Sequence, residues 1–434
     1  MQKLLSLFLL PLGVCASDTD YINNVSLDVR AVYINYDYDK GFDDAEAFVT
    51  SAKLKYEQTF LDSLTAGIAF GTVQDLGILD DDLTKRNMAY IFDKDNKSFS
   101  ILHQIYLQYK YSKSFIEVGR FELETPLVSS DDYYVLSNTF EGFHFDIKEI
   151  ENYTFRAGYL AKMSGSWDSR YDGGTFNSMT KQAWAHRADN GKEVYYQLVG
   201  DGTSPIGLHV KDAGLGYLGL EYERDALKLQ VYDHVLFDAY NSIFTQIDYK
   251  LDLDKYALLL AAQYIQYDGI GALKNNPNPD AVVDYATYSA KGEFSAKDLK
   301  IKLAYTGVSD IGSIHFFGAH GGFPQFASGM MVSYFETSLR DANLYSLTSS
   351  YDFGTKQHAL NITALYAYYD LNSDYTKNGI IGDSIHGDEY LHAYGVSGNY
   401  TYDEKLSWTM KLAQRKLEHG DKNLLFRTIL KYSF

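Results

Sequence analysis

Several features that assign proteins to familiar classes are scarce in this 434-residue chain. It has one cysteine, Cys15, which excludes a disulfide framework. It has 39 lysines and arginines against 57 aspartates and glutamates, and a net charge of −18 lacks the positive footprint that nucleic-acid binding requires. No internal stretch reaches the roughly 18 to 20 apolar residues of a membrane-spanning helix. A disulfide scaffold, a nucleic-acid binder and a helical membrane protein are therefore excluded.

The chain is rich instead in residues that favour β-structure. It has 39 tyrosines and 25 phenylalanines but only six prolines, and aromatic side chains fit the pleated surface of a sheet. Helical periodicity between strands, which an α/β enzyme of this length would show, is almost absent. The composition favours an all-β protein.

The first 16 residues predict a secretory signal peptide. A basic residue, Lys3, precedes the apolar stretch Leu4–Leu10, and small residues ending at Ala16 form a cleavage site of the A-x-A kind. Cleavage after Ala16 would remove Lys3 and no acid, which makes the net charge −19 instead of −18. It would also remove Cys15 and leave 17–434 as a single domain.

After Ala16, segments of about ten residues with alternating apolar and polar character are separated by turns or loops. Short connections, such as Ser112–Ser114 and Asp403–Lys405, alternate with longer ones rich in Asp, Asn and Gly. Transmembrane β-barrels have this asymmetry and, in a single chain, an even number of strands. The pattern predicts about 18 strands, at 25–33, 47–57, 64–73, 99–111, 115–121, 141–148, 153–160, 214–224, 226–236, 242–251, 256–267, 283–296, 299–307, 342–354, 358–370, 390–402, 406–418 and 424–434.

The final segment, Leu424–Phe434, indicates which environment surrounds these strands. One face carries Phe426, Thr428, Leu430, Tyr432 and Phe434, and the other carries Arg427, Ile429, Lys431 and Ser433. An apolar, aromatic outward face and a polar inward face are typical of a membrane barrel, in which closure pairs every backbone group. A soluble sandwich is the alternative, but so many aromatic outward faces would aggregate in water. We therefore predict an all-β fold, a transmembrane antiparallel β-barrel.

The stretch Gly119–Gly142 resembles the segment that marks OprD-type outer-membrane porins. It has a Gly-Arg pair, a Thr-Pro-Leu at 125–127, a Ser/Asp-rich centre and a closing Phe-Glu-Gly. Gly321–Pro324 and the terminal Phe434 agree with this resemblance. The family implies an 18-stranded channel in the outer membrane of a Gram-negative bacterium, with a third external loop that folds into the lumen. By the strand map, Glu122–Phe140 is that third loop.

Two positions depart from the family pattern. Tyr134 stands where the family commonly has Arg, and Ser137 stands where it often has Pro. The family's selectivity for basic amino acids and other carboxylate-bearing solutes is therefore not carried over to this chain.

Charged residues fall into two candidate groups on the predicted pore. The pore constriction would hold an acidic group together with Tyr134, namely Glu122, Glu124, Asp131 and Asp132. The lumen wall of the first and last two strands would hold a basic group, for which the resemblance implies a ladder: Arg30, Lys411, Arg415, Arg427 and Lys431. A field between them would orient dipolar solutes. Alternatively, the charges pair structurally and only keep the lumen wet.

The prediction is a porin for passive diffusion of small hydrophilic solutes and ions, with no catalytic activity, no cofactor and no metal. The negative net charge, with Asp43, Asp44 and Asp80–Asp82 in external loops, predicts moderate cation selectivity. A surface adhesin or ligand-binding barrel is the alternative, and an outer-membrane hydrolase is a third. Outer-membrane lipid and lipopolysaccharide would be partners. The sequence is compatible with a monomer and with a homotrimer, and leaves the role of loop 161–213 open.

Other signals are set aside. Gly214–Gly219 matches a dinucleotide-binding pattern, but the sequence continues as a strand and no helix follows. His315, His320 and His386 lie in predicted loops with no zinc-site spacing.

Overall fold

The computed structural model describes residues 24–39, 44–79, 91–92, 97–130, 135–164, 174–189, 192–197, 210–275, 282–312, 314–316, 318–329, 340–355, 358–371, 389–418 and 422–434. The predicted signal peptide, 1–16, lies outside these ranges, and so do Asp43, Asp80–Asp82 and His386. Among the described residues, no helix is long and apolar enough to span a membrane.

Eighteen strands form the wall, one for each strand predicted from the sequence. They are β1 (Val25–Tyr38), β2 (Ala45–Phe60), β3 (Leu64–Asp75), β4 (Phe99–Tyr111), β5 (Ser114–Phe121), β6 (Thr139–Ile147), β7 (Tyr153–Ser164), β11 (Leu215–Arg224), β12 (Leu227–Leu236), β13 (Tyr240–Leu253), β14 (Tyr256–Gly269), β15 (Asp284–Ala296), β16 (Leu299–Val308), β18 (Asn343–Gly354), β19 (His358–Leu371), β20 (Glu389–Tyr402), β21 (Leu406–Leu417) and β22 (Lys422–Ser433).

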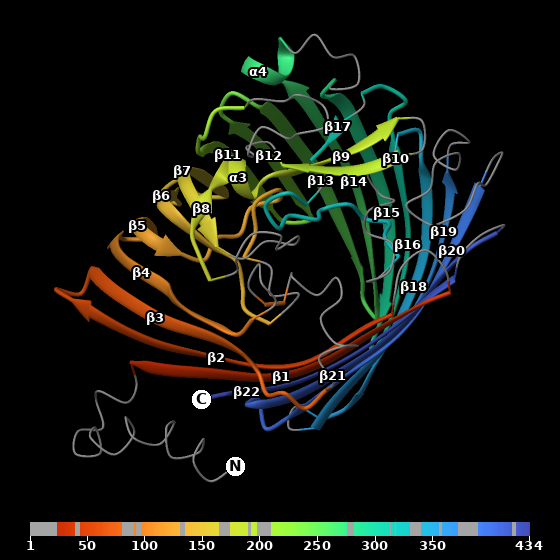
Figure 1. The fold of residues 1–434 in the computed structure, drawn as a ribbon, viewed down its shortest axis with the longest axis horizontal. Coiled ribbons are helices and arrows are strands. Elements are labelled where there is room, and N and C mark those ends of the chain that lie inside the picture. The colour runs from red at the N-terminus through yellow and green to blue at the C-terminus, as the bar shows by residue number, and fades with distance from the viewer. Residues whose placement is uncertain are drawn as a thin grey trace.

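Each wall strand pairs antiparallel with the next, and the last pairs with the first. The register of β1 and β22 runs from Asp28 opposite Ser433 to Tyr38 opposite Asn423. Figure 1 shows the red first strand and the blue last strand side by side. The barrel is therefore closed, which satisfies both edges of the sheet.

Smaller elements belong to the longer connections. β8 (Asn177–Ser178) adds to the end of β7, and α3 (Met179–Gln182) follows it directly. β9 (Trp184–Asp189) pairs with both β10 (Lys192–Gln197) and β17 (Ile314–His315), which makes a small separate sheet. α4 (Gly271–Lys274) follows β14 (Figure 1).

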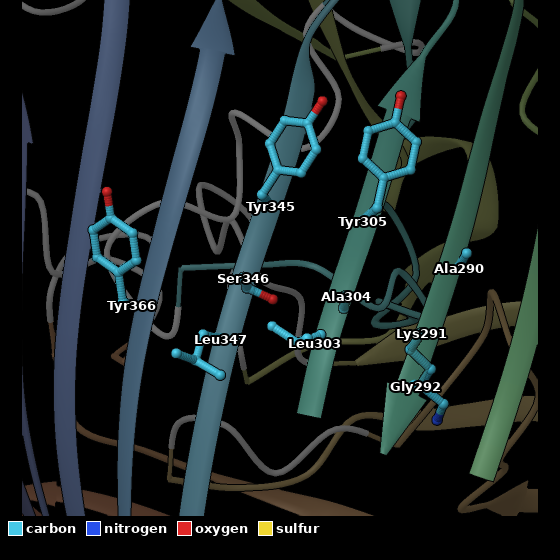
Figure 2. A pocket seen from close by; sticks show the side chains of 10 residues that line it. All are labelled: Ala290, Lys291, Gly292, Leu303, Ala304, Tyr305, Tyr345, Ser346, Leu347 and Tyr366. Atoms are coloured by element: carbon cyan, nitrogen blue, oxygen red, sulfur yellow. The ribbon is translucent and has the colours of Figure 1, made fainter. Parts of the chain in front are cut away.

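The two faces of the wall differ as the alternation of residue types predicts. On β22, Leu430 is 47% exposed whereas Leu425 is fully buried. Residues opposite each other on neighbouring strands share a face, so the exposed apolar side chains form a continuous outward belt. This belt contains a groove of about 440 Å³ across β15, β16, β18 and β19. Gly292, Leu303 and Tyr345 are among the residues that line it (Figure 2).

The strands are joined at one end by tight turns. Ser112, Asn152 and Asp225 adopt left-handed backbone conformations there, with φ of 52°, 66° and 51°. Asn and Asp tolerate this conformation, and the turns that connect antiparallel strands directly require it. These short turns are the ones that the sequence pattern predicts.

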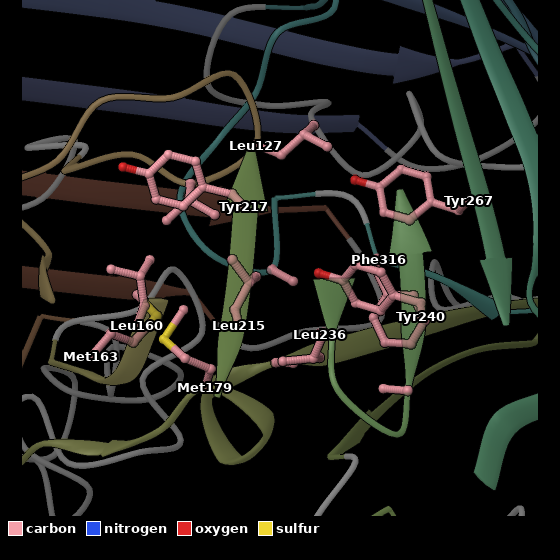
Figure 3. Close-up of a cluster of buried hydrophobic side chains, with 14 of the residues drawn as sticks. Leu127, Leu160, Met163, Met179, Leu215, Tyr217, Leu236, Tyr240, Tyr267 and Phe316 are labelled. Atoms are coloured by element: carbon pink, nitrogen blue, oxygen red, sulfur yellow. The ribbon is translucent and has the colours of Figure 1, made fainter. Parts of the chain in front are cut away.

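Buried apolar side chains lie on the inward face, where connecting segments pack against the wall. In Figure 3, Leu215, Tyr217 and Tyr240 come from wall strands, whereas Met179 and Phe316 come from connections. A second cluster joins Val32 and Ile34 to Ile91, Phe92 and Val135, and a third joins Leu344, Tyr369 and Leu391 to Phe326 and Ala327. Each of these three clusters therefore joins wall strands to connecting segments.

Candidate pore constriction and lumen wall

The β5–β6 connection, residues 122–138, carries the acidic residues predicted to narrow the pore. Its described parts are 122–130 and 135–138, so Asp131, Asp132 and Tyr134 lie outside the described residues. Glu122, the first residue after β5, accepts hydrogen bonds from Lys53 Nζ at 2.9 Å and from Ser137 Oγ at 2.5 Å. Lys53 is on β2 and was not among the residues predicted from the sequence.

The protonation of Glu122 is set by opposing effects. Burial raises its pKa, but the Lys53 ammonium and the Ser137 hydroxyl favour the carboxylate, and the net result is a pKa below the usual value for glutamate. Glu122 is therefore ionised at neutral pH, with Lys53 beside it as its counter-charge.

Glu124, the second predicted acid, makes different contacts. Its carboxylate accepts a hydrogen bond from Ser129 Oγ at 2.5 Å within the same connection. Its backbone carbonyl accepts one from Arg156 Nη1 on β7 at 2.7 Å, and the Arg156 Nε donates to Asp146 on β6 at 2.9 Å. Thr125 then lies against β12, with Oγ1 3.1 Å from His234 Nε2.

A second connection, residues 318–329, packs against the first. The backbone N–H of Ser129 donates to the carbonyl of His320 at 3.1 Å. The Gly322 backbone lies so close to Leu127 that a Cβ on Gly322 would be 2.4 Å from Leu127 backbone atoms. Beyond this contact, the Pro324 carbonyl accepts a hydrogen bond from Gln263 of β14 at 2.9 Å. The Gly-Gly pair at 321–322 is a sequence feature that could have indicated this close approach, although from the sequence it supported only the family resemblance.

The five predicted bases share the inward face of three neighbouring strands, β21, β22 and β1. Arg30 stands opposite Lys431, and Lys411 stands opposite Arg427. Arg415, two inward-facing pairs along, stands opposite Asn423, whose amide oxygen is 3.2 Å from the Arg415 Nε and Nη2 when it is oriented toward them. Arg427 is only 3% exposed. The alternation of residue types thus places these side chains together on one wall, which we call the basic wall.

The sequence and the fold are similar to those of known proteins. A family model described as "outer membrane porin, OprD family" matches residues 20–360. This chain belongs to the OprD family. Similar solved structures include Pseudomonas aeruginosa OccK9 (OpdG), with a TM-score of 0.74, 17% identity and coverage of 95% of this chain and 99% of that one. Acinetobacter baumannii OccAB4 gives a TM-score of 0.69, 16% identity and coverage of 94% and 97%. None of the curated proteins matches this chain.

Family membership confirms the resemblance and the barrel predicted from the sequence. It places this OprD-family chain in the outer membrane of a Gram-negative bacterium, so the outward apolar belt faces lipid. The dinucleotide-like stretch at 214–219 runs into β11, which a tight turn joins to β12.

His315 and His320, two histidines in the connections, are buried. His320 lies between Tyr240 Oη, 3.3 Å from Nδ1, and the Met179 carbonyl oxygen, 3.0 Å from Nε2. Burial lowers the pKa of His320 to about 4, so its ring is neutral at pH 7. In the part of the chain that the structure describes, no three His, Cys, Asp or Glu side chains converge on a metal site.

Proposed function

We propose that this protein forms a water-filled channel for passive diffusion of small hydrophilic solutes and ions, and that the β5–β6 connection folds into the lumen and narrows it. The observation that carries the proposal is the anchoring of this connection to inward-facing side chains on well-separated strands, Lys53 of β2 and His234 of β12. A segment held between such anchors leaves less open cross-section than the wall alone. No reaction and no cofactor enter the proposal.

Charges on two sides of the narrowed passage would act on the solute. The basic wall would supply one side and Glu124 of the β5–β6 connection the other, which would give the transverse field expected from the sequence. Arg30 opposite Lys431 places like charges directly across from each other, which disfavours strand pairing. A wall that only had to be wet would not require that arrangement, and this supports a role in selectivity.

We infer moderate cation selectivity from the excess of acids. The chain has 57 acidic against 39 basic residues, and external acids such as Asp44 would raise the cation concentration at the mouth. The reversal potential of purified protein in a planar bilayer under a KCl gradient tests this inference. A potential of the cation-selective sign is expected, and Arg427→Gln should move it further in that direction. A clear anion preference would mean that the basic wall, and not the acidic mouth, controls permeation.

A surface barrel whose external loops bind a ligand or another cell is the second candidate. Planar-bilayer recording separates the two functions, because a porin gives steady single-channel steps whereas an adhesin with a sealed lumen gives none. In either case the outward belt would contact outer-membrane lipid and lipopolysaccharide. Cross-linking in lipid vesicles then distinguishes a monomer from a homotrimer.

A further inference from the structure

One end of the β5–β6 connection rests on three adjacent wall strands, at a site that we call the seat and define by Ser51 of β2, Gly71 of β3 and His103 of β4. Ser51 Oγ donates a hydrogen bond to the Val135 carbonyl at 3.0 Å. His103 Nε2 lies 2.9 Å from the Ser137 carbonyl oxygen. Both side chains are buried, so the backbone of 135–137 is held by directional contacts on two strands.

Gly71, between these two strands, makes room for the residue in the middle of 135–137. A Cβ on Gly71 would lie 2.7 Å from Leu136 Cδ2 and 3.1 Å from Leu136 Cδ1. The Gly71 backbone is ordinary extended strand, so the missing side chain serves the contact with Leu136 and not the conformation of the chain. The seat is therefore shaped to receive this part of the connection.

Glu122 ties the seat to the other end of the connection. It directly follows β5, whereas Ser137 lies shortly before β6, and the Glu122 carboxylate accepts a hydrogen bond from Ser137. Lys53 stands opposite Gly71 in the register of β2 and β3, and its ammonium is 2.9 Å from the same carboxylate oxygen. A hydrogen bond between charged partners is about twice as strong as a neutral one. One carboxylate thus joins the start and the end of the connection to the wall.

We propose that Lys53 and Glu122 form a latch that holds the constriction in place, with Lys53 as a positioning residue. This inference rests on the proposed channel function and deepens it. Glu122 then does not act as a free acid on passing ions, because its charge is compensated by Lys53. Opening the latch has two consequences. The connection becomes free to leave the seat, and an uncompensated carboxylate is added to the lumen.

Single-channel recording of Lys53→Met in planar bilayers tests the latch. We expect at least a several-fold increase in transitions between conductance levels, and a reversal potential shifted toward cations. Lys55→Met is the matched control, because Lys55 lies on the same strand and face and is 2.9 Å from Glu57, yet its carboxylate partner belongs to the wall. Lys55→Met should show transitions between conductance levels as often as the wild type does.

The double variant K53E/E122K reverses the pair and should restore steady conductance, which a general loss of packing would not do. Leu136→Ala, which removes the side chain that packs against Gly71 and leaves the ion pair intact, should increase the transitions without the shift in reversal potential. Steady, wild-type-like recordings from both Lys53→Met and Leu136→Ala would overturn the latch while leaving the channel function standing. Absence of any conductance in the wild type would instead overturn the channel function itself.

Discussion

The assignment of outward and inward faces predicts that the same substitution destabilises the barrel to very different extents at two positions of β21. Leu412 lies at the centre of the strand and is 48% exposed on the outward face. Thr409, three residues earlier, lies on the inward face, where its hydroxyl donates to Asn399 at 2.8 Å. Leu412→Arg would place a guanidinium in hydrocarbon, whereas Thr409→Arg would place it in the polar interior.

The expected magnitude follows from the cost of a charge on the lipid face. An arginine near the bilayer midplane destabilises a barrel by about 2–4 kcal/mol. Because about 1.4 kcal/mol changes an equilibrium tenfold, Leu412→Arg should lower the ratio of folded to unfolded protein by roughly 30- to 700-fold. Thr409→Arg should lose at most the neutral hydrogen bond to Asn399, about 1 kcal/mol.

Denaturant-dependent folding into lipid vesicles measures both variants, with tryptophan fluorescence as the signal. Trp408 lies on the outward face of the same strand, so it reports directly on insertion. An equal loss of stability in the two variants, or a larger loss in Thr409→Arg, would refute the assignment of faces. Because neighbouring strands share their faces in register, that result would undermine the placement of the basic wall as well.

Two further predictions concern the backbone and the latch. Gly119→Ala should strongly reduce the folded fraction in vesicles, because Gly119 has a φ of 130° and a Cβ would lie 2.2 Å from the Ile105 carbonyl oxygen. The control Gly398→Ala, with nothing within 4 Å of the added Cβ, should fold normally. Equal folding of the two variants would contradict this reasoning. The frequency of conductance transitions should stay constant as pH falls from 7 to about 4.3, the ordinary pKa of glutamate. Because the pKa of Glu122 is below the ordinary glutamate value, the carboxylate and the latch persist down to that value and are lost only as pH falls through the lowered pKa. More frequent conductance transitions already at pH 5 to 6 would contradict this prediction.

The strands and the basic wall could be predicted because both depend on an alternation of period two. Arg427 and Lys431 fall on one face of a strand by counting alone, and a closed ring makes the first and last strands neighbours. The β5–β6 connection could be located because it lies between two recognisable strands. The same count would have placed Lys53 on the inward face, but it does not identify the partner of a side chain across the barrel.

The seat could not be predicted, because a β-bulge breaks the alternation at one of its residues. Opposite Ala69 and Phe70, the register of β4 skips one residue, and His103 and Gln104 are both buried. A bulge inserts an extra residue and redirects a side chain, which here brings His103 to the Ser137 carbonyl. The buried clusters were also out of reach, since the sequence gives no sign that Phe316 or Phe92 packs against the inside of a distant strand.

The seam between β1 and β22 has a consequence for how the channel matures. Arg30 comes from one terminal strand, Arg427 and Lys431 come from the other, and Leu27 and Phe434 bind each other's backbone at 2.9 and 3.0 Å. In an assembly intermediate in which β1 and β22 have not yet paired, this row of cations is therefore divided between the two free edges of the sheet. These cations come together, against their mutual repulsion, only when β1 and β22 pair. The pairing that closes the barrel against lipid therefore also assembles the positively charged side of the lumen.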